Sequence, residues 1–269
     1  MSWSGPRAFR LLRQARGPGQ ENMAVDEALL ESVGRGAAPP TLRLYGFVPP
    51  TLSVGRFQKA RELIDRERAA RDGLTLVRRP TGGQAVLHDQ ELTYSVALAR
   101  EHLKPFGKRE VYRFIAEMLL AGLEAAGIRA RSNSARQGSD RNPDCFRSTG
   151  QYEIADERER KLVGSAQALD RRAALQHGAI PLDGSYRRIS RYLRASAAEG
   201  HGLPASLGEE LGRAVGFEEA QEALARGAAR WLSLQGLALE PGELSAPERR
   251  RAGELLAQKY SSDAWNLAY

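Results

Sequence analysis

The sequence contains very little cysteine. Only one of its 269 residues is a cysteine, Cys145, and its four histidines are scattered along the chain. A single cysteine excludes an internal disulfide, and isolated histidines lack the paired ligand spacings of a zinc site. Cys145 is therefore a free thiol, a metal ligand without cysteine partners, or a buried apolar side chain.

Long apolar runs are also missing. No segment approaches the roughly 20 apolar residues of a membrane-spanning helix, and the first residues carry scattered arginines without the apolar run of a signal peptide. We therefore expect a cytoplasmic protein with no membrane partner. Its 42% hydrophobic and 27% charged residues are an ordinary balance for a folded globular chain.

The charge is strongly basic but is not concentrated. A formal net charge of +7 leaves nucleic acid, a membrane surface or an acidic protein open as partners. Both signs are interleaved in segments such as residues 61–72, which is typical of a solvated helix face. The sequence has no zinc-finger spacing, RNA-recognition signature or basic stripe with interleaved aromatics. We therefore expect no nucleic-acid partner.

Hydrophobic periodicity predicts an α+β fold on one mixed sheet, with strands clustered around helices. Helices are expected at residues 21–36, around 60–71 and at 109–127, and the chain after about residue 189 is expected to be helical. Strands are expected at residues 41–47, 51–57, 74–79, 160–169 and 173–183, and residues 80–99 resemble a hairpin or strand pair around a glycine loop. We predict a single domain over residues 1–269, with its motif-bearing core at about 21–183.

One candidate site is the segment "RRPTGGQAVLHD" at residues 78–89. Consecutive glycines, Gly82 and Gly83, can adopt positive φ and let a ligand approach the backbone closely. Arg79 could face a carboxylate, a phosphate or a carrier-linked group. The alternative is a tight turn with a surface arginine pair. The segment is neither a P-loop nor a Rossmann fingerprint.

A second candidate is "KLVGSAQ", residues 161–167. Lys161 opens a β-run and can place its ammonium beside a bound carbonyl. The small residues Gly164, Ser165 and Ala166 leave room for a flat or linear ligand. The alternative is an exposed lysine at a strand end, followed by a bulge.

Cys145 lies in a polar segment without helical or strand periodicity, so we expect it in a loop. Reactive cysteines need access and a positive neighbour that stabilises the thiolate. An ammonium about 4 Å away at an effective dielectric near 20 is worth about 4 kcal/mol before desolvation, and Lys161 could supply it. His88 and His177 compete for the role of base, and for His177 a hydrogen-bonded core histidine is the alternative.

Six segments in this order resemble the superfamily of lipoate ligases, biotin ligases and octanoyltransferases: "NMAVDEAL", "LSVGRFQ", "RRPTGGQAVLHDQELTYSV", "CFRSTGQYEI", "KLVGSAQ" and "LQHGAIPLD". The likeness is greatest to LipM-type octanoyltransferases, because the cysteine precedes the lysine strand. The fold that this implies is a mixed sheet flanked by helices. The alternatives are an ATP-dependent lipoate ligase and a non-catalytic lipoyl-domain binding protein.

The resemblance implies octanoyl transfer from octanoyl-acyl carrier protein to a lysine of a lipoyl domain, such as the glycine cleavage H protein. It implies that Cys145 forms an acyl-thioester and that Lys161 stabilises the thiolate, without a cofactor. Arg109, Arg113, Arg187 and Arg188 are candidates for steering the acidic carrier. The implied substrate-binding residues are Arg79, Gly82, Gly83, His88, Gly164, Ser165, Ala166, His177 and Gly178.

Overall fold

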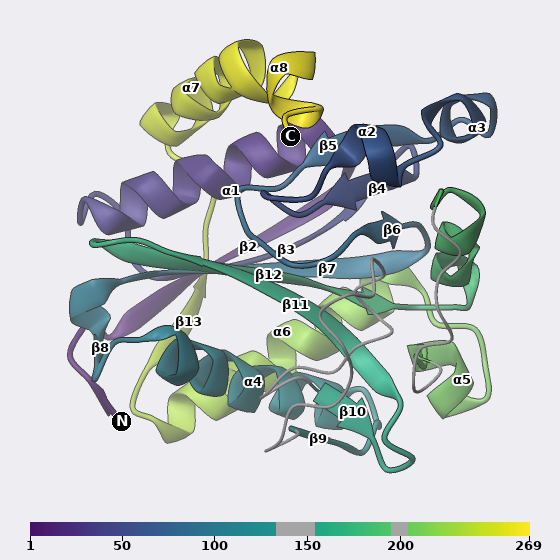
Figure 1. Ribbon diagram of the computed structural model, residues 1–269. Coiled ribbons are helices and arrows are strands. Elements are labelled where there is room, and N and C mark those ends of the chain that lie inside the picture. The colour runs from purple at the N-terminus through teal and green to yellow at the C-terminus, as the bar shows by residue number, and fades with distance from the viewer. Residues whose placement is uncertain (133–153, 195–203) are drawn as a thin grey trace.

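The computed structural model describes residues 1–132, 154–194 and 204–269, and a mixed sheet runs through its centre (Figure 1). In these ranges the sheet order is β13-β2-β3-β7-β12-β11-β10-β9. The first three strands are mutually parallel, and the remaining neighbours are antiparallel. The strands are β13 (Ala238–Pro241), β2 (Ala8–Gly17), β3 (Thr41–Phe47), β7 (Glu91–Ala99), β12 (Ala173–Pro181), β11 (Lys161–Leu169), β10 (Ile154–Asp156) and β9 (Ala130–Ser132).

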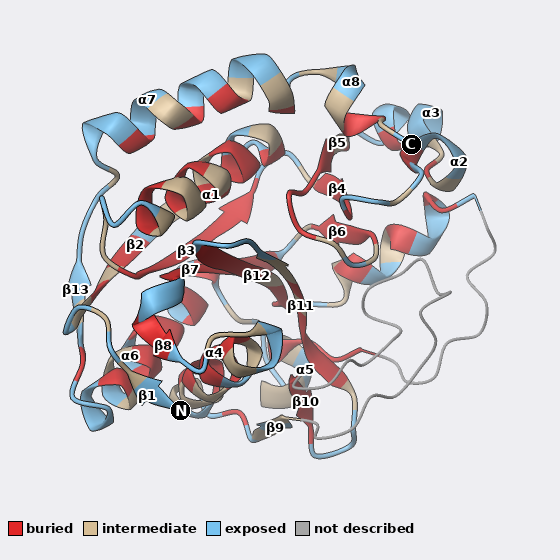
Figure 2. Cartoon of the chain, turned by 60° about the vertical axis from the view of Figure 1, so that its left-hand side comes forward, coloured by how far each residue is buried: buried red, intermediate tan, exposed pale blue. Residues whose placement is uncertain are grey.

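Helices cover both faces of this sheet, which confirms the predicted α+β class. α4 (Lys108–Ala125) and α6 (Phe217–Leu234) lie side by side on one face and enclose the largest apolar core. α1 (Gly19–Gly34) lies on the other face, and α7 (Ala246–Leu255) packs outside it (Figure 1). Figure 2 shows α1 largely buried, because it has the sheet on one side and α7 on the other.

A smaller sheet sits beside the first, in the order β5-β4-β6. It consists of β5 (Thr75–Arg78), β4 (Thr51–Val54) and β6 (Val86–His88). Its core includes residues from three short helices, α2 (Ala60–Leu63), α3 (Arg66–Arg71) and the 3₁₀ helix η3 (Ser185–Arg191). The helix expected around residues 60–71 is thus two short helices.

The hairpin expected at residues 80–99 is wrong. β5 and β6, on either side of the glycines, both pair with β4 and not with each other, and β7 belongs to the large sheet. The connecting loop crosses the end of β4 instead of reversing the chain tightly. It is held there by backbone hydrogen bonds from Arg79 N to the Val54 carbonyl at 2.9 Å and from Arg56 N to the Thr81 carbonyl at 2.8 Å.

The chain ends add elements that local patterns did not predict. β2 and β13 extend the large sheet, so the C-terminal part is not wholly helical. β1 (Ser2–Trp3) pairs with β8 (Leu103–Lys104). The remaining short helices are η1 (Arg100–His102), α5 (Leu207–Leu211), η4 (Leu256–Tyr260) and α8 (Asp263–Asn266). In the described ranges, no helix combines the length and apolar character needed to cross a membrane.

Arg78 joins the last residues to the small sheet. Its side chain is fully buried and donates to the carbonyls of Gly55, Arg56 and Gln58 at 2.8–2.9 Å. The same guanidinium donates to the carbonyl of Trp265 at 2.9 Å and to that of Ala268. A buried guanidinium is stable when its donors are satisfied in this way. Arg78 therefore has a structural role, because it holds the last residues of the chain against the small sheet.

Candidate active site

The glycine loop, residues 79–85, lies between β4 and β11. Gly83 has a φ of +86°, a conformation that suits glycine. A Cβ on Gly83 would lie 3.4 Å from the Ala166 Cβ, so the loop faces the small-residue stretch of β11. A Cβ on Gly55 would lie 1.9 Å from the Gly83 carbonyl oxygen, so β4 also approaches the loop closely. This packing brings two of the predicted segments together.

Arg79 is inside the molecule. It is 3% exposed, and its Nη1 donates to the Ser53 Oγ at 2.7 Å and the Ser53 carbonyl at 3.1 Å. Its Nη2 donates to the carbonyls of Gly82 and Gln84 at 3.0 and 2.9 Å. The alternative of a surface arginine pair is therefore wrong. The guanidinium holds the shape of the glycine loop, and a contact between Arg79 and a substrate stays a prediction.

Lys161 begins β11 and is 3% exposed, so the alternative of an exposed strand-end lysine is also wrong. Further along β11, Ser165 pairs with Gly178 of β12, and the Ser165 Oγ lies 2.8 Å from the Tyr94 hydroxyl. A Cβ on Gly178 would lie 2.3 Å from the Gly164 carbonyl oxygen and 2.7 Å from the Tyr94 ring. Gly178 thus allows the tyrosine to reach across the strand pair.

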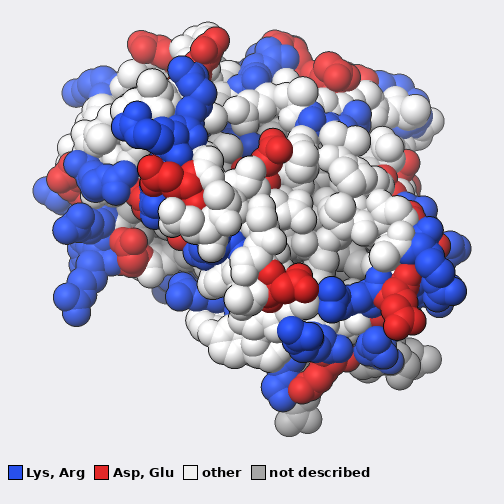
Figure 3. Space-filling view, turned by 90° about the horizontal axis from the view of Figure 1, so that it is seen from above, with Lys and Arg blue, Asp and Glu red and all other residues white. Residues whose placement is uncertain are grey.

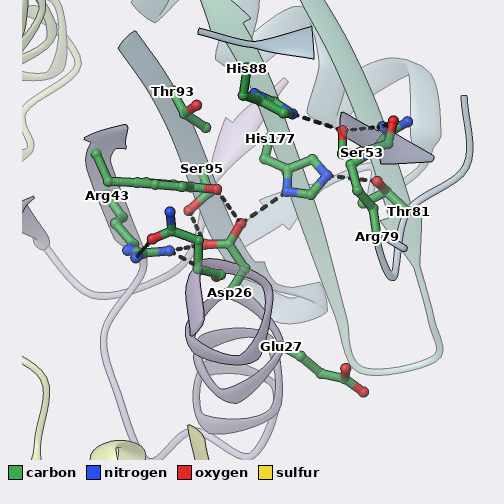
Figure 4. A network of polar contacts seen from close by, with 12 residues as sticks. Asp26, Glu27, Arg43, Ser53, Arg79, Thr81, His88, Thr93, Ser95 and His177 are labelled. Atoms are coloured by element: carbon green, nitrogen blue, oxygen red, sulfur yellow. Dashed lines mark hydrogen bonds and ion pairs between the residues drawn. The ribbon is translucent and has the colours of Figure 1, made fainter. Parts of the chain in front are cut away.

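His177 is buried within a polar network around Asp26 of α1 (Figure 4). Its Nδ1 lies 2.9 Å from the Asp26 Oδ2, and its Nε2 lies 2.6 Å from the Thr81 Oγ1. Asp26 also accepts hydrogen bonds from Arg43, Tyr45 and Ser95 at 2.7–2.8 Å. The hydrogen-bonded core histidine weighed from the sequence is what the structure shows.

These contacts shift the pKa values of both partners. Burial alone would raise the pKa of Asp26, but the charge of Arg43 and hydrogen bonds from His177 and Arg43 hold it below its ordinary value. Burial lowers the pKa of His177, and Asp26 offsets this only in part. At neutral pH the pair is therefore a carboxylate and a neutral imidazole. The imidazole donates a hydrogen bond from Nδ1 to Asp26 and accepts one at Nε2 from the Thr81 hydroxyl.

His88 is placed in a similar way. Its Nε2 lies 2.7 Å from the Ser53 Oγ, and its Nδ1 lies 3.2 Å from the Glu91 Oε1. The ring stacks on Phe47 with centroids 4.0 Å apart. Both nitrogens already have protein partners, so His88 is not poised over an open cavity as a base.

Cys145 lies outside the described residues, so its distance from Lys161 and its surroundings are not part of this geometry. The structure brings Gly83 together with Ala166, His177 with the glycine loop, and Ser165 with Gly178. In the described ranges, no group of three or more His, Cys, Asp or Glu side chains could hold a metal ion.

Sequence reasoning missed the polar side chains behind the predicted site. Asp26 was within the quoted segment "NMAVDEAL", where a carboxylate among apolar helix residues was the available signal. Thr81 was within the quoted glycine segment, and Glu91 lies two residues beyond it. Ser53 and Tyr94 carry no local pattern that separates them from ordinary strand residues.

The mixed sheet flanked by helices matches the fold of solved lipoate-protein ligase structures. The profile of the family described as "Lipoyl protein ligase A/B catalytic domain" matches residues 18–229, and the chain belongs to this family.

Within that family, the similar curated relatives are octanoyltransferases. Octanoyltransferase LipM of Kyrpidia tusciae is 42% identical, and the match covers 97% of this chain and 98% of the relative. Octanoyltransferase LipM of Symbiobacterium thermophilum is 41% identical, with 96% and 98% covered. The crystal structure of lipoate-protein ligase A bound with ATP has a TM-score of 0.79 and 26% identity, covering 97% of this chain and 98% of that one. The resemblance to LipM-type acyltransferases is thus confirmed.

Proposed function

We propose that the protein moves an octanoyl group from acyl carrier protein to a lysine of a lipoyl domain, such as the glycine cleavage H protein, through an acyl-thioester on Cys145. The LipM relatives are octanoyltransferases, which supports octanoyl transfer in lipoate biosynthesis as the reaction class. The donor, the acceptor and the covalent route are our proposal.

The chemistry balances without ATP. The Cys145 thiolate attacks the carbonyl of the donor thioester and displaces the carrier thiolate, which takes up a proton. The acceptor lysine, as a neutral amine, then attacks the enzyme thioester, loses a proton and releases the Cys145 thiolate. Lys161 stabilises that thiolate. Backbone amides near Gly82, Gly83 or Ser165 face the oxyanion in both steps.

The observation that carries the proposal is the contact between the glycine loop and β11. Gly83 lies against Ala166, and β11 begins five residues earlier at the buried Lys161. Five residues of extended strand span roughly 16 Å, which is long enough to lie along an extended eight-carbon chain. Gly164 and Ala166 lie on the same face of β11 and are the small residues that leave room for it, whereas the Ser165 hydroxyl bonds to Tyr94.

The test is intact-mass spectrometry after the protein is mixed with octanoyl-acyl carrier protein and no acceptor. We expect the wild type to gain one octanoyl mass, to lose it to neutral hydroxylamine, and to pass it to an added lipoyl domain. Cys145→Ser should lose transfer, because a hydroxyl without an adjacent base is a weaker nucleophile than a thiolate.

A ligase would behave differently in the same assay. Persistent transfer by Cys145→Ser, or transfer only with ATP and free octanoic acid, would replace the thioester route with acid activation. Complex formation with the lipoyl domain but no turnover would instead indicate a binding protein.

A further inference from the structure

Two buried hydrogen-bond networks end at the glycine loop, and their histidines lie near each other (Figure 4). The Asp26 network runs from Asp26 through His177 to Thr81. The Glu91 network runs from Glu91 through His88 and Ser53 to Arg79. In each network, a histidine therefore bridges a carboxyl group and a hydroxyl group. Every member of both networks is at most 5% exposed.

The direction of the hydrogen bonds can be worked out in one of the networks. In the Asp26 network, the ionised carboxylate only accepts, so His177 donates from Nδ1 and Thr81 donates to Nε2. In the Glu91 network, the Ser53 Oγ accepts from Arg79 and shares a second hydrogen bond with the His88 Nε2. The His88 Nδ1 shares a hydrogen bond with the Glu91 carboxyl group. Each hydroxyl is thus hydrogen-bonded to a histidine.

Both networks hold the loop, one through Thr81 and the other through Arg79. Thr81 is the residue immediately before the two glycines, and its side chain is tied to β12 through His177. Arg79 is tied to β4 through Ser53 and grips the carbonyls of Gly82 and Gln84. The glycines have no side chains to hold their own backbone in place. The neighbouring side chains, together with the backbone hydrogen bonds at Arg79 and Thr81, therefore set the distance between the loop and Ala166.

We propose that Thr81 and Ser53 are positioning residues that hold the glycine loop against β11, and that His177 and His88 serve as hydrogen-bond links to Asp26 and Glu91 instead of as bases. The proposal rests on the octanoyl transfer proposed above, because the loop forms one wall of that acyl site. A displaced loop leaves the acyl group misaligned with its nucleophile, and a misplacement of about 1 Å can cost roughly 100-fold in rate.

The experiment compares Thr81→Val with Thr81→Ser. Valine keeps the volume of threonine but removes the hydroxyl, whereas serine keeps the hydroxyl. Thr51→Val is the matched control, because Thr51 is a fully buried threonine of β4 whose hydroxyl bonds to Pro49 and Thr75 and not to the loop. The measured quantities are the single-turnover rate of Cys145 octanoylation at saturating donor and the preference for octanoyl over decanoyl donor.

We expect Thr81→Val to slow octanoylation by about tenfold or more and to weaken the preference for octanoyl donor. Thr81→Ser should restore most of both. Thr51→Val should lower the melting temperature comparably but leave the rate and the preference unchanged. The apparent pKa of the pH–rate profile should be the same in Thr81→Val and wild type, because neither histidine is a base.

A double variant tests whether the two networks act on the same loop. Thr81→Val combined with Ser53→Ala should slow octanoylation by less than the product of the two single effects, because either loss already frees the loop. Fully multiplicative effects would contradict a shared target.

The outcomes separate this inference from the proposed function. If the wild type forms no thioester, the octanoyl-transfer route fails and the inference fails with it. If the wild type forms the thioester but Thr81→Val matches Thr51→Val in rate and preference, or Thr81→Ser is as slow as Thr81→Val, only the positioning role is overturned. A shifted pH–rate profile in Thr81→Val would return His177 to the role of base.

Discussion

At the scale of single residues, the proposed acyl transfer depends on the buried charge of Lys161. Lys161 is 3% exposed, and burial strengthens the attraction between opposite charges. In the proposed reaction its ammonium stabilises the Cys145 thiolate before acylation and after deacylation. A cation beside a thiolate lowers the pKa of the thiol.

We therefore predict that alkylation of Cys145 by iodoacetamide titrates below the reference thiol pKa of about 8.5. Lys161→Ala should move the midpoint upward by about one pH unit or more. Lys59→Ala is the control, because that lysine is exposed and pairs with Glu62. An unchanged midpoint in Lys161→Ala would remove Lys161 from this role.

At the scale of elements, glycine decides how closely two helices pack. α4 and α6 meet at Gly122 and Gly227, where a Cβ on Gly227 would lie 2.1 Å from the Ala121 carbonyl oxygen and 2.5 Å from the Gly122 Cα. The obstructing atoms are backbone, which cannot move aside like a flexible side chain. Alanine has the higher helix propensity, so the packing clash and the propensity act in opposite directions.

We predict that Gly227→Ala lowers the free energy of unfolding by about 1–3 kcal/mol, the usual cost of overpacking. Gly253→Ala in α7 is the matched control, because a Cβ there meets nothing within 4 Å. That control should be neutral or stabilise by up to about 1 kcal/mol. Denaturant unfolding of the three proteins measures both values, and equal stabilities would show that α6 can move away from α4 without cost.

At the scale of the whole molecule, the excess of basic residues is spread over the surface. Figure 3 shows Lys and Arg beside Asp and Glu around a largely neutral area. Three arginines expected to steer the carrier are paired with acids: Arg113 with Glu117, Arg187 with Glu209 and Arg188 with Asp89. Local pairing removes much of their contribution to a long-range field. A role for these three arginines in steering the carrier stays a prediction.

Other cations surround a cavity of about 590 Å³ at the end of α1 and the β11–β12 turn. Among the residues that the structure describes, four of the cations lining it form no ion pair: Arg100, Lys104, Arg171 and Arg172. The chain has a formal net charge of +7, and these four cations are not among the predicted arginines.

We predict that acyl-enzyme formation at low donor concentration slows by about threefold or more as ionic strength rises from about 0.05 to 0.5 M, because screening weakens the attraction of an acidic carrier. The rate at saturating donor should change little. A small uncharged octanoyl thioester is the control donor and should show no salt dependence. The same rate at both ionic strengths with the carrier substrate would exclude electrostatic steering.

Local sequence patterns determined much of the architecture. The apolar stripe of α4, the short apolar segments of β3, β11 and β12, and the helix at α1 were all predictable. Each of these elements buries one face, and the apolar residues of that face recur at a regular spacing along the sequence. The ordered motifs also determined the family, because each motif keeps its spacing along the chain.

Only the tertiary structure decided which polar groups meet. Asp26 and His177 lie 151 positions apart, and Thr81 and His177 lie 96 apart, so no local period links them. Pairing of β5 and β6 with β4, and of β13 with β2, likewise joins strands by backbone hydrogen bonds that are indifferent to side-chain identity. A buried hydrogen bond forms where folding removes water from both partners, and that is a property of the packed molecule.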